Sequence, residues 1–143
     1  MDRNIIMGLQ NKDNTKAYEL LLEMEKQSAE NDGLYVYFDD YIKLLDHKSS
    51  FVRTRGFRMA CAQAPWDKEE KLEANFDKLL KMMDDPKPIA LRQCLRALHI
   101  VVLYKPRLMD QIQEKIKTMN LKQYKDSMLP LIEKDIEELQ GIM

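Results

Sequence analysis

Residues 38–66 read FDDYIKLLDHKSSFVRTRGFRMACAQAPW, and residues 76–104 read FDKLLKMMDDPKPIALRQCLRALHIVVLY. The two stretches align over their whole length without a gap, at a shift of 38 residues. Apolar residues in both recur every three or four positions, which is the period of an α-helix, and strand-like alternation is missing. A tandem unit of this length made of two helices is typical of helical repeat proteins, in which neighbouring pairs stack to bury their apolar faces.

The composition of the whole chain also favours helices. The chain has 143 residues, of which 45% are apolar and 33% charged, with only four glycines and five prolines. So few turn residues argue against a sandwich or barrel, and the apolar fraction argues against a disordered chain. The length suits one ordinary domain, so we expect a single domain over residues 1–143.

The helical period continues outside the two copies and predicts seven helices. Asp13 or Asn14 can cap the first of them, and Gly33 can end it in a left-handed conformation. The segment Leu34–Phe38 is rich in strand-forming residues, but its apolar face continues into the next helix, so we expect it to be helical. Pro130 predicts either a kink or a first-turn position in the last helix. The predicted helices cover residues 15–30, 34–45, 50–64, 68–83, 88–104, 107–118 and 123–140.

The first copy resembles HEAT-type repeats. The similar pattern is Leu44-Leu45-Asp46, a short turn, and Val52-Arg53 opening the second helix, whereas the second copy has Ala90-Leu91 at that place. The resemblance is best over residues 34–66 and 72–104. It implies a short right-handed α-α superhelix (a HEAT- or armadillo-like solenoid) of about three to four helical pairs, with the flanks acting as caps and the second helices lining the concave surface.

The chain as a whole is also similar to a group of small bacterial helical proteins sometimes labelled "SufBD protein". That label implies a part in iron–sulfur cluster assembly. However, Cys61 and Cys94 have no second Cys or His at ligand spacing, and an iron–sulfur or zinc site usually takes four ligands. We therefore expect no metal, no cofactor and no disulfide bond.

The net charge of −1 conceals an uneven distribution. Residues 48–107 carry a net charge of +6, while the segments before and after them carry −5 and −2. The low cysteine content favours a reducing compartment, and no targeting or membrane-spanning segment is recognisable, so we expect a cytoplasmic protein.

Basic side chains gather on one side of the second helix in each copy. At 100° per residue, Arg55 and Arg58 fall on one side of the helix over 50–64, as Arg92, Arg96 and His99 do on the helix over 88–104. The shift of 38 residues gives Arg58 and Arg96 the same repeat position, so they should lie one above the other on stacked helices. Guanidinium groups bind carboxylates and phosphates through paired hydrogen bonds. The row either binds a ligand or is a solvated face that pairs with nearby carboxylates. As a binding site it should protrude without carboxylate partners inside the molecule. The row consists of Arg55, Arg58, Arg92, Arg96 and His99.

Three more side chains have expected roles. Arg53 falls on a different side of its helix, so we expect it to be structural and to pair with a turn carboxylate such as Asp46 or Asp84. Trp66 and Tyr104 occupy equivalent helix ends. We expect them to close the end of a repeat, although they could instead flank a groove and stack on a ligand.

These observations favour a non-enzymatic adaptor that binds an acidic protein or peptide on a basic concave face. The alternative is nucleic-acid binding with a grip like that of HEAT-like DNA glycosylases, which the net acidic charge disfavours. A third hypothesis is a cysteine-dependent enzyme, because Cys61 and His99 share one repeat position. The oligomeric state is not determined by the sequence.

Overall fold

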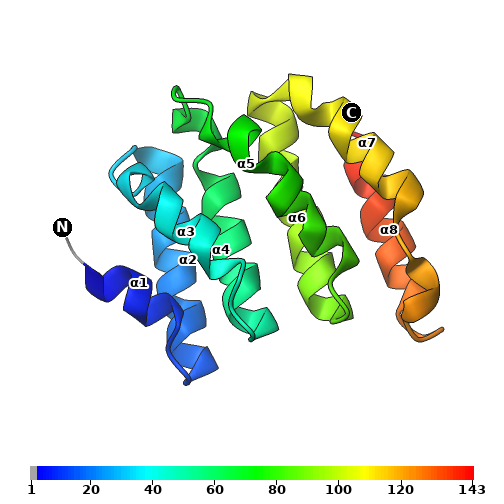
Figure 1. The fold of residues 1–143 in the computed structure, drawn as a ribbon, viewed down its shortest axis with the longest axis horizontal. Helices are drawn as coiled ribbons and strands as arrows, with labels where there is room; N and C mark the ends of the chain where they lie inside the picture. Colours follow the sequence, from blue (N-terminus) through cyan, green and yellow to red (C-terminus); the bar gives the residue numbers. More distant parts are fainter. Residues whose placement is uncertain (1–2) are drawn as a thin grey trace.

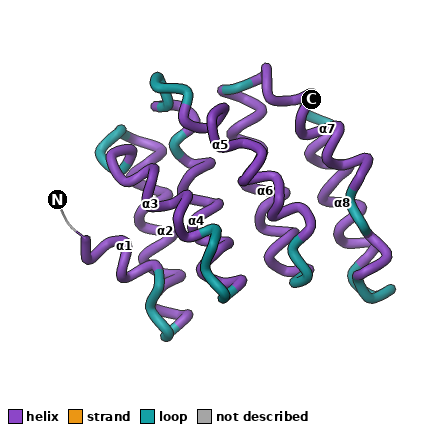
Figure 2. The backbone as a smooth tube through the Cα atoms, viewed as in Figure 1, coloured by secondary structure: helices purple, strands orange, loops and turns teal. Residues whose placement is uncertain are grey.

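The computed structural model describes residues 3–143, and residues 1 and 2 of the predicted domain lie outside the described part. Every regular element in residues 3–143 is a helix, and no strand occurs there, so the prediction of an all-α fold is confirmed (Figures 1 and 2). The α-helices are α1 (Arg3–Leu9), α2 (Asn14–Glu30), α3 (Phe38–Leu44), α4 (Ser50–Ala62), α5 (Lys71–Leu80), α6 (Pro88–Tyr104), α7 (Met109–Thr118) and α8 (Leu129–Gln140).

Short 3-10 segments extend or join these helices. The first of them leads directly into α3, so the segment predicted to be helical despite its strand-forming residues is helical from Tyr35 onward, with Leu34 in the preceding turn. The 3-10 segments are η1 (Tyr35–Tyr37), η2 (Ala64–Trp66), η3 (Lys81–Asp84), η4 (Pro106–Leu108) and η5 (Leu121–Gln123).

Three predictions of local structure need correction. Helix α1 was not predicted, because its short apolar stretch offers little periodicity. The last helix begins at Leu129 rather than at residue 123, and Pro130 lies in its first turn. Gly33 does not have a positive φ. Its backbone N–H donates to Asn31 Oδ1 at 2.9 Å, and this Asx-turn changes the direction of the chain after α2.

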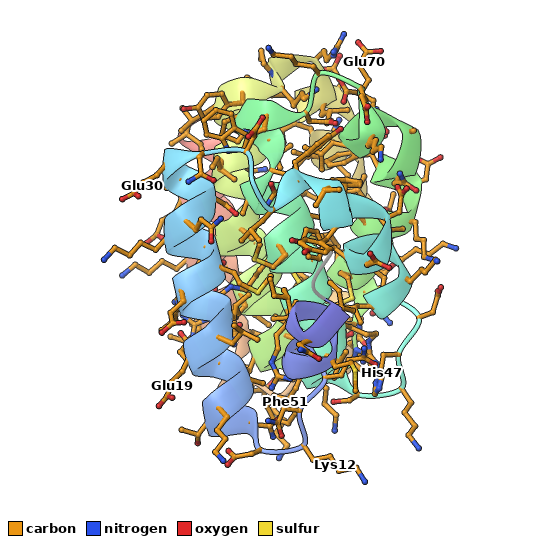
Figure 3. All side chains as sticks on the ribbon, turned by 90° about the vertical axis from the view of Figure 1, so that its left-hand side faces the viewer. Lys12, Glu19, Glu30, His47, Phe51 and Glu70 are labelled. Atoms are coloured by element: carbon orange, nitrogen blue, oxygen red, sulfur yellow. The ribbon has the colours of Figure 1, made fainter. Side chains whose placement is uncertain are left out.

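The helices form two layers that follow the chain order along the long axis of the molecule (Figure 1). One layer contains α2, α4, α6 and α8, each packed against the next, and the other layer contains α3 and α5. Figure 3 shows α2 and α3 on opposite sides when the molecule is seen from its N-terminal end. None of the helices in residues 3–143 combines the length and the apolar character needed to cross a membrane.

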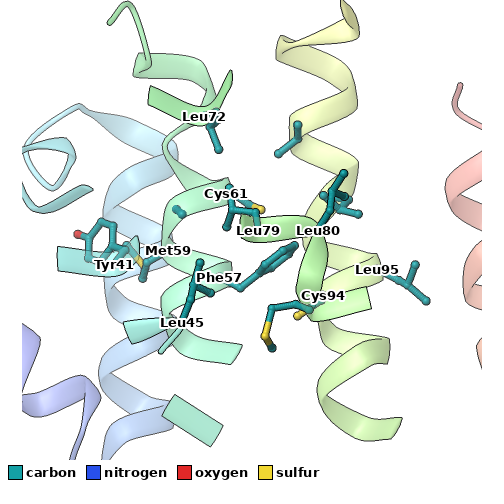
Figure 4. Close-up of a cluster of buried hydrophobic side chains, with 14 of the residues drawn as sticks. Tyr41, Leu45, Phe57, Met59, Cys61, Leu72, Leu79, Leu80, Cys94 and Leu95 are labelled. Carbon is teal, nitrogen blue, oxygen red and sulfur yellow. The ribbon is translucent and has the colours of Figure 1, made fainter. Parts of the chain in front are cut away.

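The apolar core lies between these layers. Phe57 of α4 and Leu95 of α6 have no exposed surface and point into it (Figure 4). Gly56 allows α4 to approach α3 closely, because a Cβ atom at this position would lie 2.7 Å from both Leu44 Cβ and the Tyr41 carbonyl oxygen. The packing of the first predicted helical pair therefore depends on a residue without a side chain.

Polar side chains join corresponding ends of successive helices. Arg53 is structural, as predicted, but its partner is Asp85 rather than Asp46 or Asp84, with Nη2 and Nε at 2.9 and 3.0 Å from Oδ2. Trp66 and Tyr104, which were both expected to close the end of a repeat, lie in different environments. Trp66 Nε1 donates to the Ser28 carbonyl oxygen at 2.6 Å, whereas Tyr104 is largely exposed.

Candidate functional site

Arg55 is not part of an exposed basic row. It is only 4% exposed, because the turn between α1 and α2 covers the start of α4. Its Nη1 donates to the Leu9 carbonyl oxygen and its Nη2 to Asn14 Oδ1, both at 2.8 Å. Burial lowers the pKa of Arg55, and no ion pair with a carboxylate compensates within the described residues.

Arg58 has a carboxylate partner inside the molecule, so it does not meet the condition set for a ligand-binding row and fits the alternative of a face that pairs with nearby carboxylates. Its Nε and Nη2 bind the two oxygens of Glu25 at 3.0 and 2.7 Å, and its Nη1 donates to Gln93 Oε1 at 2.9 Å. The guanidinium also lies over the ring of Tyr18, 5.5 Å from its centre. Arg58 therefore connects α2, α4 and α6 through bonds within the chain.

The remaining members of the row lie on α6, beside α8. Arg92 Nε binds Asp135 Oδ2 at 2.6 Å, so it too has the carboxylate partner that a free binding side chain would lack. Arg96 Nη2 lies 3.9 Å from the other oxygen of Asp135, but its side chain is 61% exposed. His99 is half-buried. Arg96 is thus the one exposed side chain among the five predicted site residues.

The two cysteines lie in the apolar core (Figure 4). Cys61 and Cys94 have no exposed surface, and burial raises the pKa of both thiols. A nucleophilic cysteine needs the opposite environment, with an accessible thiol whose pKa is lowered. No group of three or more His, Cys, Asp or Glu side chains in the described part of the chain is placed to hold a metal ion.

An open groove of about 650 Å³ lies across α2, α4 and α6, at the end where α4 and α6 begin. Its walls are mostly apolar, and we call it the α2–α4–α6 groove. Phe51 and Ile89 stand on its rim with 57% and 64% of their surfaces exposed. Figure 3 shows Phe51 at the same end of the molecule as Lys12, opposite Glu30 and Glu70. The apolar lining of the groove includes Tyr18, Leu21, Phe51, Pro88, Ile89 and Ala90.

Charges near this groove are unbalanced. Lys87 and the buried Arg55 line it, while Glu19 is the one acidic residue among its lining residues. The cap residues of α4 and α6, Ser49 and Lys87, donate their own N–H groups to His47 Nδ1 and Asp85 Oδ1 at 3.0 Å, but neither cap side chain bonds the first N–H groups of its helix. Helix N-termini carry a partial positive charge, so this end of the groove favours an anion over a cation.

Two further hollows in the described part of the chain differ in character. They have volumes of about 700 and 570 Å³ and lie along α5, beside α4 and α7 respectively. Two of their lysines are engaged in ion pairs: Lys78 Nζ lies 2.7 Å from Asp46 Oδ2, and Lys115 pairs with Asp84. The α2–α4–α6 groove is the better candidate, because its lining is mostly apolar and includes exposed apolar side chains, whereas charged residues make up most of the lining of the other two.

A buried ion network lies near the opposite end of the molecule. Asp67 accepts hydrogen bonds from Tyr35 Oη at 2.6 Å and from the backbone N–H groups of Lys71 and Leu72 at 2.9 Å. Lys105 Nζ lies 3.2 Å from Asp67 Oδ2 and 3.0 Å from Glu73 Oε1. This network joins the start of α5 to the residue after α6, and no hollow among those described opens onto it. We interpret it as structural.

No protein-family model, curated protein or solved structure matches this chain.

The sequence pattern of basic residues did not predict the groove, because the groove is marked by exposed apolar residues rather than by charged ones. A usable signal was present: Phe51 and Ile89 occupy the same position in the two aligned copies, at the second residue of each second helix. The helical period places both away from the core face. An apolar residue that is repeated off the core face has no structural role to explain it.

Proposed function

We propose that this chain is a non-enzymatic protein- or peptide-binding module, and that the α2–α4–α6 groove is its binding surface. The observation that carries the proposal is the exposure of Tyr18, Phe51 and Ile89 around one groove formed by three successive helices. Contiguous exposed apolar surface is costly in water, and it usually marks an interaction site. An open groove of this kind suits a segment of polypeptide, because grooves between packed helices accept the apolar face of a peptide.

The proposal includes the short HEAT-like superhelix that the sequence predicts. Contacts between helices recur at about the repeat spacing, which supports it. The Asp46–Lys78 ion pair is followed by Asp84–Lys115, about 38 residues later. Proteins built in this way commonly use their extended surfaces for binding.

The rival functions have less support. A nucleic-acid grip requires exposed cations, and Arg55, Arg58 and Arg92 are engaged within the molecule. A cysteine-dependent enzyme or an iron–sulfur role requires accessible thiols, whereas both cysteines are buried. Free cysteines suit a reducing compartment, so the proposal keeps the cytoplasm as the location.

The test uses a random peptide library displayed on phage and selected on the immobilised full chain. A Phe51→Ser/Ile89→Ser double variant removes the apolar rim. A Leu103→Ser/Tyr104→Ser variant removes two similarly exposed apolar side chains from the far end of α6 and is the matched control. All four side chains are exposed, so urea unfolding should show little change in stability for either variant.

We expect selected peptides to bind the unmodified chain and the control, and to bind the rim variant at least about tenfold more weakly, since each lost apolar contact costs about 1 kcal/mol or more. Failure to select any peptide, or equal binding to the rim variant, would refute the proposed function.

A further inference from the structure

Arg55 differs from the other arginines whose side chains the structure describes. Arg53, Arg58, Arg92, Arg96 and Arg107 each lie within 4 Å of a carboxylate oxygen. Arg55 is the most deeply buried of them, yet its partners are a carbonyl oxygen and an amide oxygen, which carry no net charge. Buried cations usually have an anionic partner, because burial removes the stabilising effect of water. The floor of the α2–α4–α6 groove therefore holds an uncompensated positive charge.

Lys87 adds a second positive charge at the rim. It precedes the first residue of α6 and is exposed, and no ion pair within residues 4–143 involves its ammonium group. Glu19 is the one acidic residue that lines the groove, so the lining carries a net positive charge even before the helix N-termini are considered.

We propose that the partner segment is acidic and amphipathic: its apolar side chains pack on Tyr18, Phe51 and Ile89, and one of its carboxylates binds Lys87 above Arg55. This inference rests on the proposed function and names the partner of the same groove. Lys87 makes the direct bond, and Arg55 attracts the carboxylate through space from beneath. A peptide fits better than a small carboxylate ligand, because the groove is open along its rim and small ligands are usually enclosed on most sides.

The experiment compares peptides selected on the chain with versions in which each Asp or Glu is replaced by Asn or Gln. Affinities are measured by fluorescence polarisation on the unmodified chain, on Lys87→Gln, and on Lys68→Gln. Lys68 is a matched control, because it is exposed, has no ion pair in the described chain, and lies in the turn before α5, at the far end of the molecule from the groove. Arg55 itself is left unchanged, because its bonds to Leu9 and Asn14 hold the N-terminal turn.

We expect the selected peptides to be net acidic, and one carboxylate-to-amide change to weaken binding about five- to tenfold. Lys87→Gln should weaken binding of the acidic peptide by a similar factor and leave the affinity of the amide peptide nearly unchanged. Lys68→Gln should leave the affinities of both peptides unchanged. Binding of the acidic peptide should also weaken at high salt.

Neutral or basic selected peptides, or equal affinities for the acidic and amide peptides, would overturn the inference. In both of those outcomes groove-dependent binding persists, so the proposed function survives. The absence of any groove-dependent peptide would instead refute the proposed function itself.

Discussion

The side chain of Arg58 is fixed on several sides, which decides what its removal should do. It is bound by both oxygens of Glu25, by Gln93 and by the face of the Tyr18 ring. The Glu25 carboxylate is itself largely covered, with 27% of its side chain exposed. Loss of the arginine would leave a half-buried carboxylate without its partner, and such groups cost free energy.

We predict that Arg58→Ala lowers the free energy of unfolding by about 1–3 kcal/mol. Arg96→Ala, in the same repeat position but exposed, should change it by less than about 0.5 kcal/mol. Urea unfolding monitored by circular dichroism measures both. In a double-mutant cycle, Arg58→Ala combined with Glu25→Gln should destabilise the protein by less than the sum of the two single substitutions. Equal effects of the two arginine substitutions would show that the ion pair contributes little.

Asp67 links stability to pH. Burial alone would raise the pKa of Asp67, but hydrogen bonds from Tyr35, from the Leu72 and Lys71 backbone and from Lys105 outweigh it, so the pKa is lowered. In the unfolded chain an aspartate has a pKa of about 3.9. The stabilisation is therefore complete above this value, and it is lost as the pH falls from about 4 through the lower pKa of the folded state.

We predict that Asp67→Asn lowers the free energy of unfolding by about 2–4 kcal/mol at neutral pH, because Lys105 then loses one of its two carboxylate partners. The difference from the unmodified chain should narrow as the pH falls from about 4, where the aspartate of the unfolded chain becomes protonated, through the lower pKa of the native carboxylate. Urea unfolding across this pH range provides the measurement. Asp46→Asn, which removes an exposed carboxylate, serves as the control and should have an effect below about 1 kcal/mol. A difference independent of pH would contradict the argument.

At the scale of elements, the contact between α3 and α4 is closer than side chains would permit. Gly56 faces the Tyr41 carbonyl oxygen, which belongs to the backbone of α3 and cannot rotate away as a side chain can. Alanine is the better helix former by about 1 kcal/mol, so helix propensity and packing predict opposite effects. Packing should dominate, because a 2.7 Å contact with backbone requires one helix to move.

We predict that Gly56→Ala destabilises the protein by about 1–3 kcal/mol. Gly141→Ala is the control, because this glycine is exposed at the end of α8 and has ordinary helical angles. Its replacement should be neutral or stabilising by up to about 1 kcal/mol. Thermal unfolding of the two variants distinguishes these effects. A stabilised Gly56→Ala variant would mean that α3 and α4 are further apart than described.

For the whole molecule, the order of the helices predicts how stability is distributed. Helix α4 packs against α2, α3 and α6, and α6 packs against both α4 and α8, whereas α1 and α7 lie at the edges. When each unit contacts only its neighbours, the edge units can unfold while the centre remains folded.

We predict that native-state hydrogen exchange protects the amides of α4 and α6 most strongly, and that α1 and α7 exchange through local opening. Mass spectrometry of the exchanging full chain, read helix by helix, makes the measurement. Exchange of all helices with one common free energy would instead indicate a single cooperative unit. In that contradicting case, Arg58→Ala would lower the free energy of exchange equally in every helix.

The sequence by itself determined the helical class, most helix positions and the structural role of Arg53, because these follow from local periodicity and helix-ending residues. It did not determine which side chains are free. The angular position of Arg58 on α4 was predictable, but its partner Glu25 precedes it by 33 residues, and Asp135 follows Arg92 by 43. A periodicity shows which side of a helix a residue occupies and says nothing about which distant side chain lies opposite. Only the packing of α2, α4, α6 and α8 decided that the arginines are bonded internally and that Phe51 and Ile89 remain exposed.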